Sequence, residues 1–278
     1  GIEKTAKGFT FHTKGGDFYA TKCIMATGGK TLKKSGSDGS GFLYLESLGH
    51  HIIDLVPGLI GLKGKQSFFA DIAGIRADVK VDLYIESTHV CSEQGELQLT
   101  NYGISGIPVF QLSRIATRAL SEQKKVYATL NFVPFWEKEQ CLTYFKERFK
   151  KADEKHIGEA LIGFFPEKLI PVLLEESHIK AAKYANRLQT EELERFIDTV
   201  QGLRVDITDW NTFDTAQVTA GGVDTDEIDA ETMESKLCPG LYFAGEMVDI
   251  DGICGGYNLQ WAWSSGAVAG IHVARELS

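Results

Sequence analysis

The residues best suited to chemistry lie near the end of the chain, where glycines and carboxylates interrupt an apolar pattern. A short apolar strand, Leu241–Ala244, runs into Gly245, and the carboxylates of Glu246 and Asp249 follow it. The pair Gly255–Gly256 then opens a helix. Because glycine has no Cβ, a flat and bulky ligand can approach the backbone there. A helix start also presents unpaired N–H groups and a partial positive charge, which attract an anion or an electron-rich oxygen.

These properties match a flavin. Its pyrimidine C2 oxygen, and N1 of the reduced ring, are acceptors suited to a helix start, and charge near N1 tunes the redox chemistry. Glu246 or Asp249 could accept hydrogen bonds from ribityl hydroxyls. The alternative is a glycine-rich structural turn before a buried helix. The candidate flavin-binding residues of this block are Gly245, Glu246, Asp249, Gly252, Gly255, Gly256, Tyr257, Asn258, Leu259 and Gln260.

A second block follows a short apolar strand near the start of the chain. The strand Cys23–Ala26 ends in Ala26, Thr27, Gly28 and Gly29, and a loop rich in Gly, Ser and Lys continues to Gly41. Glycines at the carboxyl end of a parallel strand let the backbone approach a dinucleotide. These four residues are therefore further candidates for cofactor binding, although a flexible loop would have the same composition.

The elements that position both blocks are read from periodicity. Alternating apolar residues over 8–20 predict a hairpin, and the strictly alternating segment 79–86 predicts a half-buried strand. The signal is mainly β from 59 to about 132, with one helix over 108–120, and helical over 137–200. Strands are expected again at 203–207, 213–219 and 241–244, before a last helix from 257 to about 275.

This order predicts an α/β domain that is split in sequence by inserted material. The expected division is 1–58 and 223–278 for the split Rossmann-like domain, 59–133 with 202–222 for a β-rich domain, and 134–201 for a small helical domain.

Composition restricts the classes of function. The 278 residues carry a formal net charge of −9 and no basic stripe, which argues against nucleic-acid binding. No apolar run approaches the roughly 20 residues that cross a bilayer, so no membrane span is expected. The five cysteines are scattered without C-x-x-C spacing, which predicts neither a metal site nor a disulfide framework and favours the reducing cytoplasm.

The two blocks resemble those of the BaiN-type bacterial flavoproteins, NAD(P)/FAD-dependent oxidoreductases that include aminoacetone oxidase. The similarity covers Ala-Thr-Gly-Gly at 26–29 and nearly all of 240–260. Segment 215–223 resembles the family's strand re-entering the FAD domain, and 99–106 resembles its Thr-His-x-Gly-x-Ser-Gly motif. The resemblance implies FAD as cofactor, in a split FAD-binding Rossmann-like domain that carries a β-rich substrate domain and a helical cap.

The chain departs from this family pattern in two places. Asn101 stands where the family has histidine, so that histidine's role in proton transfer cannot be carried over. The family's opening Gly-x-Gly-x-x-Gly unit, which holds the FAD pyrophosphate, has no counterpart after an N-terminal strand. We therefore expect an N-terminal dinucleotide-binding unit to be missing, and the chain alone to bind FAD poorly. Its parallel strands 23–26 and 241–244 would then be open to pairing.

The expected activity is hydride transfer between flavin N5 and a small organic substrate. The resemblance favours an amine or aminoketone oxidase that passes electrons to oxygen and produces hydrogen peroxide. One alternative is an NAD(P)H-dependent reductase of an activated C=C bond, and another is a non-catalytic fragment that holds no FAD. A homo-oligomer is left open, and no catalytic residue is assigned.

Other conspicuous side chains have ordinary interpretations. His50 and His51 are expected to pack or to face solvent, and Arg76 to lie at the surface. Trp261 and Trp263 are expected in the core. Cys254, next to the glycine pair, is interpreted as a small space-filling residue.

Overall fold

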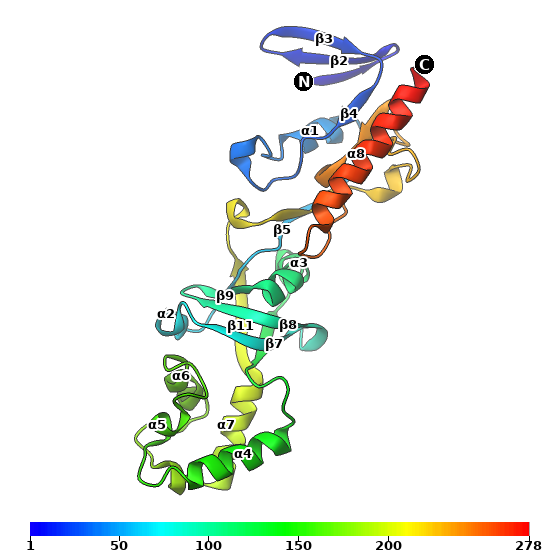
Figure 1. Ribbon diagram of the computed structural model, residues 1–278. Helices are drawn as coiled ribbons and strands as arrows, with labels where there is room; N and C mark the ends of the chain where they lie inside the picture. Colours follow the sequence, from blue (N-terminus) through cyan, green and yellow to red (C-terminus); the bar gives the residue numbers. More distant parts are fainter. Residues whose placement is uncertain (278) are drawn as a thin grey trace. The chain divides into compact units, whose positions relative to one another are not determined.

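The chain leaves one compact unit, forms a second, and returns to the first. The computed structural model describes residues 1–277. The first unit holds residues 1–60 and those from 211 onward, and the second unit is Gly61–Trp210 (Figure 1). The first unit is therefore an α/β unit split in sequence, as predicted. The finer domain boundaries expected from the sequence remain predictions, because a compact unit is not by itself an independently folding domain.

The strands and helices of the first unit are β1 (Ile2–Thr5), β2 (Gly8–Thr13), β3 (Gly16–Ala20), β4 (Cys23–Met25), α1 (Ser40–Ser47), β5 (Ile52–Gly58), β12 (Val218–Val223), β13 (Leu241–Phe243) and α8 (Tyr257–Glu276). Those of the second unit are β6 (Leu62–Gly64), α2 (Phe69–Ile72), β7 (Arg76–Ile85), β8 (Thr88–Thr100), β9 (Gly103–Gly106), α3 (Ile107–Ser121), β10 (Val126–Asn131), α4 (Lys138–Lys150), α5 (Ile157–Leu161), α6 (Leu169–Glu176), α7 (Thr190–Gly202) and β11 (Leu203–Trp210).

Two short parallel strands, β4 and β13, form the centre of the first unit. Cys23 pairs with Leu241, and Met25 with Phe243. All three residues of β13 are buried, which explains its wholly apolar sequence. The predicted parallel strands and the predicted N-terminal hairpin, β2 with β3, are both confirmed.

The expected strand over 213–219 is wrong in its first half. Phe213–Thr215 is a 3-10 turn, and β12 begins at Val218. The backbone N–H and the hydroxyl of Thr215 both donate to the carbonyl oxygen of Thr212, at 2.9 and 2.8 Å. Threonine side chains compete in this way with extended structure. From Val218 the chain pairs antiparallel with β5 inside the first unit.

The last helix begins at Tyr257, as predicted, but only one of its tryptophans packs inward. Trp261 is half-buried and its Nε1–H donates to the carbonyl oxygen of Gly245 at 3.0 Å. Trp263 is 68% exposed, so its expected place in the core is wrong. Residues two apart on a helix point in widely different directions, and the buried face here contains Ser265 and Ala269.

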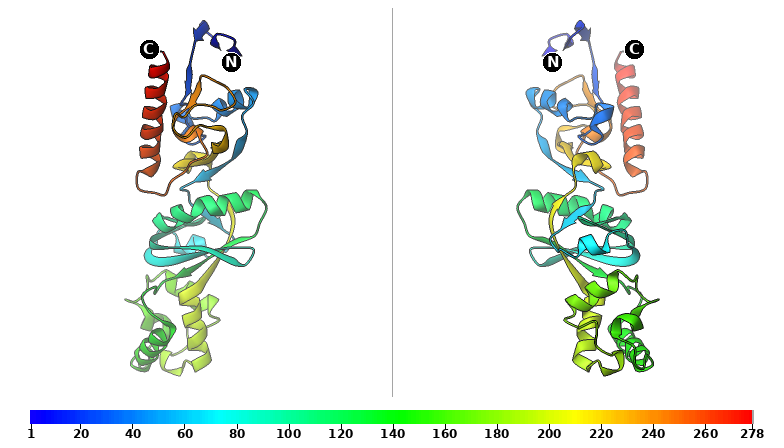
Figure 2. Two further views of the ribbon diagram at one scale, coloured as in Figure 1. Left: turned by 90° about the vertical axis from the view of Figure 1, so that its right-hand side faces the viewer. Right: turned by 90° about the vertical axis from the view of Figure 1, so that its left-hand side faces the viewer.

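The second unit is drawn in cyan to yellow in Figure 2. It is built on a closed barrel with the strand order β10-β11-β6-β9-β8-β7. Alternation on β7 sends Val79, Val81 and Leu83 into its core, where all three are fully buried. The segment 138–202 is helical, as predicted, and its four helices are α4 to α7. Phenylalanines cluster there, with the rings of Phe145 and Phe196 edge-on at 5.5 Å.

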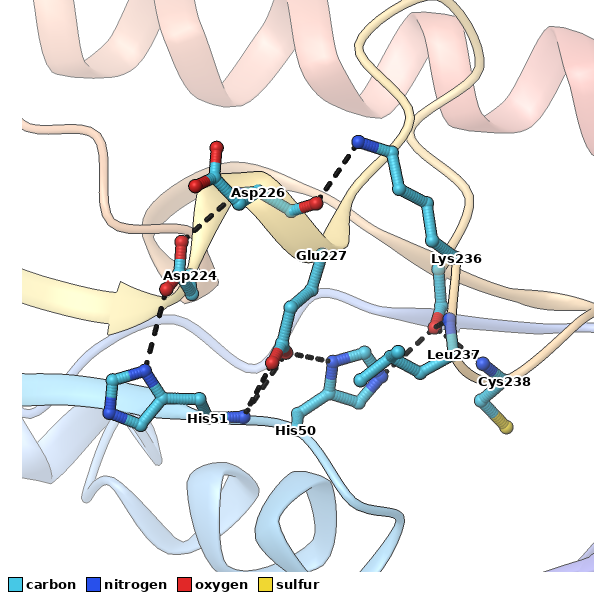
Figure 3. A network of polar contacts seen from close by, with 9 residues as sticks. His50, His51, Asp224, Asp226, Glu227, Lys236, Leu237 and Cys238 are labelled. Carbon is cyan, nitrogen blue, oxygen red and sulfur yellow. Dashed lines mark hydrogen bonds and ion pairs between the residues drawn. The ribbon is translucent and has the colours of Figure 1, made fainter.

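A buried histidine ties together three segments of the first unit (Figure 3). His50 Nδ1 lies 2.8 Å from Glu227 Oε2, and its Nε2 lies 3.0 Å from Ser235 Oγ. The Ser235 hydroxyl oxygen also accepts from the N–H groups of Leu237 and Cys238, at 3.1 and 2.7 Å. A hydroxyl has two acceptor sites and one proton, so this proton goes to His50 Nε2. In this arrangement His50 Nε2 accepts from Ser235, and Nδ1 donates to Glu227.

This Ser-His-Glu arrangement has the order of contacts of a hydrolase triad, but its burial makes it structural. The Ser235 and His50 residues are each only 4% exposed, and both acceptor sites of the hydroxyl oxygen are occupied. His51, by contrast, is exposed. His50 is therefore packed in the interior and His51 faces solvent, which are the two positions that the sequence analysis expected for these histidines.

We predict that His50→Gln lowers the free energy of unfolding by about 1–3 kcal/mol, because a glutamine cannot reach both partners and leaves a buried polar group unpaired. His51→Gln is the matched control and should change it by less than about 0.5 kcal/mol. Urea unfolding of the three proteins measures this. Equal losses in the two variants would contradict the proposed role of His50.

Candidate functional site

The carboxylate of Glu246 joins the ends of three strands. It lies in the 3-10 turn Gly245–Met247, directly after β13. Its Oε2 accepts the N–H of Gly29, beyond β4, at 2.9 Å, and its Oε1 accepts the N–H of Thr219, in β12, at 2.6 Å. Burial raises the pKa of Glu246 above its ordinary value, and the two N–H donors partly offset this rise.

The turn after β4 is packed so closely that glycine is required. A Cβ at Gly29 would lie 2.3 Å from Thr219 Oγ1 and 2.6 Å from Glu246 Oε2. Gly28 has a φ of 74°, a left-handed conformation that favours glycine. The N–H of Lys30 donates to Thr219 Oγ1 at 2.7 Å. The backbone of this turn is therefore held against β12 through the side chains of Thr219 and Glu246.

Asp249 makes a second carboxylate contact with β12. Its Oδ1 accepts the N–H of Gly221 at 3.0 Å, and its own N–H donates to the carbonyl oxygen of Val223 at 3.0 Å. Glu246 and Asp249, expected to accept from ribityl hydroxyls, thus already bind backbone N–H groups. A carboxylate has about four acceptor positions, so the two bonds to Glu246 leave capacity for a ligand hydroxyl.

The start of α8 combines open backbone at Gly256 with N–H groups that have no partner inside the helix. Gly256 has a φ of 93°, and nothing lies within 4 Å of where its Cβ would be. The first bond within the helix runs from the N–H of Gln260 to the carbonyl oxygen of Gly256, at 3.0 Å. The N–H groups before Gln260 have no partner inside the helix. This surface can accept a flat ring with acceptor oxygens or nitrogens at its edge.

The side chain of Asn258 is bonded to the preceding loop and does not face an open surface. Its Oδ1 accepts the N–H of Gly252 at 2.8 Å, and its Nδ2 donates to the carbonyl oxygen of Gly252 at 2.9 Å. Gln260 donates from Nε2 to Ser264 Oγ at 2.9 Å, while Tyr257 and Leu259 are exposed. Asn258 therefore joins the two ends of the loop 252–258, which leads into α8.

Two residues that the sequence did not single out complete the arrangement. Ser265 Oγ accepts the N–H of Gly245 at 2.8 Å and donates to the carbonyl oxygen of Trp261 at 2.7 Å. Thr219 bonds the turn after β4, as described above. The only sign in the sequence that Ser265 has a structural role is that it is a polar residue on the face of the last helix that is otherwise buried. These contacts bring the blocks 26–29 and 245–260 into one region of the first unit.

Other candidate residues lie outside this region or have ordinary environments. Arg76 is exposed and pairs with Glu96 at 3.0 Å. Asn101 is exposed in the turn between β8 and β9. Among residues 1–277, no group of three or more His, Cys, Asp or Glu could hold a metal ion. Within the same range, no helix is long and apolar enough to cross a membrane.

Comparison with known proteins decides the family. The model of the HI0933-like protein Rossmann domain matches residues 1–272. The chain belongs to this family. The resemblance to BaiN-type flavoproteins, inferred from the two glycine blocks, is thereby confirmed.

Two curated relatives of the chain carry different names. A 3-dehydro-bile acid delta(4,6)-reductase of Clostridium scindens is 44% identical over 97% of this chain and 66% of its own length. A ribosomal RNA dihydrouridine synthase of Escherichia coli is 29% identical over 95% of this chain and 63% of its own length. The chain therefore spans just under two thirds of the length of these relatives.

The raised pKa of Glu246 makes a prediction with a definite sign. The folded protein binds this proton more tightly than the unfolded chain, so the group's stabilisation is full below the unfolded pKa and is lost as the pH rises through the folded pKa. Glutamine does not titrate. We therefore expect the wild type to lose stability relative to Glu246→Gln as the pH rises from about 4 to about 7.

Urea unfolding across this pH range measures the difference between the two proteins. Glu231→Gln, a substitution at an exposed carboxylate, is the control and should show no such trend. A wild type that instead gained stability over Glu246→Gln with rising pH would mean that the two N–H donors outweigh burial.

Proposed function

We propose that this chain forms the greater part of a FAD-dependent oxidoreductase that reduces an activated C=C bond of a small organic substrate, with NAD(P)H as the electron source. The observation that supports it best is the open backbone at Gly256, where α8 begins with N–H groups that have no partner inside the helix. The carboxylates of Glu246 and Asp249 stand earlier in the same glycine-rich block. A relative that is 44% identical and is named a reductase supports the reaction class.

The fit of this region to FAD depends on backbone rather than on side chains. The flat ring would lie against the glycines, with its pyrimidine edge toward the N–H groups that open α8. Glu246 would offer its remaining acceptor positions to ribityl hydroxyls, and Asp249 follows it in the same block. Thr27–Gly29 would line the same region, because the Gly29 N–H is held by Glu246. When bound, FAD would supply the hydride chemistry through its N5 position.

The protein's own part is to hold this surface rigid. Asn258 clamps the loop at Gly252, and Ser265 and Trp261 clamp the turn at Gly245. A preorganised site needs no rearrangement when charge develops on the ring edge. The electrostatics near that edge would come from the α8 start, which is positive, and from the Glu246 and Asp249 carboxylates, which accept N–H groups of β12.

The names of the relatives favour reduction of a double bond over oxidation of an amine. A delta(4,6)-reductase is named for the double bonds on which it acts, and dihydrouridine carries two more hydrogens than uridine. Both names therefore describe the addition of two hydrogens across C=C. Amine or aminoketone oxidation with release of hydrogen peroxide, suggested by the resemblance to aminoacetone oxidase, stays a prediction without such support.

Stopped-flow reduction of the full-length protein's flavin tests the proposal. We expect NADH or NADPH to bleach the flavin within the turnover time, and aminoacetone to leave it oxidised. An α,β-unsaturated ketone should then reoxidise the flavin faster than oxygen alone does. The saturated ketone of the same skeleton is the control and should not accelerate reoxidation. Reduction by aminoacetone, with no reduction by NAD(P)H, would contradict the proposal and support the oxidase.

A further inference from the structure

A cavity of about 440 Å³ lies beside α1 in the first unit. Its wall is formed by the loop that follows the Gly28–Gly29 turn, by α1 and by β5. The volume falls within the roughly 300–1,000 Å³ of small-molecule sites. The N–H of Lys30 donates to Thr219 Oγ1 at 2.7 Å, and the same lysine lines the cavity. The cavity therefore begins one residue beyond the turn of the candidate flavin site.

Part of the cavity wall is apolar and open to a ligand. Leu43 of α1 is 67% exposed, and Ile52 and Leu55 of β5 are half-buried. All three residues line the cavity. Branched aliphatic side chains of this kind bury the face of a flat ring, as in most small-molecule sites. This part of the wall can therefore hold a flat heterocycle.

Two carboxylates of the cavity are free to accept hydrogen bonds. Glu46 lies on α1 and Asp54 on β5, and both are exposed. Among residues 1–277, neither side chain has a hydrogen bond or an ion pair. Asp38, by contrast, already accepts the N–H of Ser40 at 2.9 Å. Since a carboxylate only accepts, Glu46 and Asp54 select a ligand that brings hydroxyl donors, and the ribose of a nucleotide is such a ligand.

Lys30 is the only cation among the described residues that line the cavity. Its Nζ lies 4.9 Å from the ring centroid of Phe213 and has no ion pair within residues 1–277. A lysine of this kind can bind a phosphate as a point charge. The lining carries three carboxylates and this one ammonium group, a formal charge of −2. It can therefore pair with one anionic group near Lys30, and it repels a ligand that carries further negative charge beside the carboxylates.

We propose that this cavity holds the adenosine end of NADH, and that the protein therefore uses NADH in preference to NADPH. The adenine lies against Leu43 and Leu55, the ribose hydroxyls donate to Glu46 and Asp54, and the pyrophosphate faces Lys30. NADPH differs by a 2′-phosphate, which would meet carboxylates and no arginine. The inference rests on the proposed function, which takes NAD(P)H as the electron source, and adds the place and the choice of the nucleotide.

Binding of the adenosine end alone tests the cavity without any redox step. Titration of the full-length protein with ADP-ribose should show saturable binding. 2′-Phospho-ADP-ribose should bind at least about tenfold more weakly, because like charges meet. Asp54→Ala and Glu46→Ala should each weaken ADP-ribose binding by about tenfold, since a charged acceptor is lost. Asp54→Arg should shift the preference toward the phosphorylated probe. Equal affinity for the two probes, or ADP-ribose binding unchanged in both alanine variants, would overturn the proposal.

Stopped-flow reduction of the bound flavin separates this inference from the proposed function. 1-Benzyl-1,4-dihydronicotinamide has the reducing ring of NADH but no adenosine or pyrophosphate to place in the cavity. Asp54→Ala should slow reduction by low concentrations of NADH by about tenfold. Reduction by the benzyl compound should change by less than about twofold. Glu231→Ala, at an exposed carboxylate outside the cavity lining, is the matched control and should change neither rate.

The two proposals fail in different ways. A flavin that neither donor reduces would contradict the proposed function, and the ADP-ribose titration would still decide the cavity. Reduction by NADH that is equal in the wild type and Asp54→Ala would place the nucleotide elsewhere and leave the reductase intact. A variant that slows only reoxidation by the unsaturated ketone would assign the cavity to the organic substrate instead. Circular dichroism checks folding, and Glu46→Ala, on an exposed part of α1, remains informative if Asp54→Ala does not fold.

Discussion

A buried carboxylate organises the first unit, and the candidate site depends on it. Glu246 accepts N–H groups from Gly29 and Thr219, which are 217 and 27 residues away in sequence. Without this acceptor, two buried backbone donors at the ends of β4 and β12 would lose their partner, at about 1–3 kcal/mol each. The closeness of these strands in turn requires glycine at 29. The residues of the candidate site at this sheet edge are therefore also the residues that hold its strands together.

The sequence predicted most of the elements because their signals are local. Alternation marked β7, and the glycine pair before an apolar run marked the start of α8. The two glycine blocks were placed correctly at the ends of parallel strands, since strand-to-glycine junctions occur where a sheet edge meets a loop. Only the segment 213–219 was read as one strand where a threonine turn comes first.

Long-range polar contacts were beyond sequence reasoning. Nothing local joins His50 to Glu227, or Ser265 to Gly245, because each pair meets only in the folded chain. Trp263 was assigned to the core on its type alone, although its direction on α8 is opposite to the buried face.

The central claim is that the glycines at the start of α8 receive the flavin ring, and flavin content of two variants tests it most directly. Gly256→Val places a branched side chain on that surface. Gly49→Val is matched, since Gly49 has a φ of 94° against 93° at Gly256 and neither has an atom within 4 Å of a built Cβ. Both variants carry the same backbone strain, about 1–2 kcal/mol. In the full-length protein we expect Gly256→Val to fold but to lose bound flavin, measured by visible absorbance, and Gly49→Val to keep it. Equal flavin content in the two variants would contradict the placement.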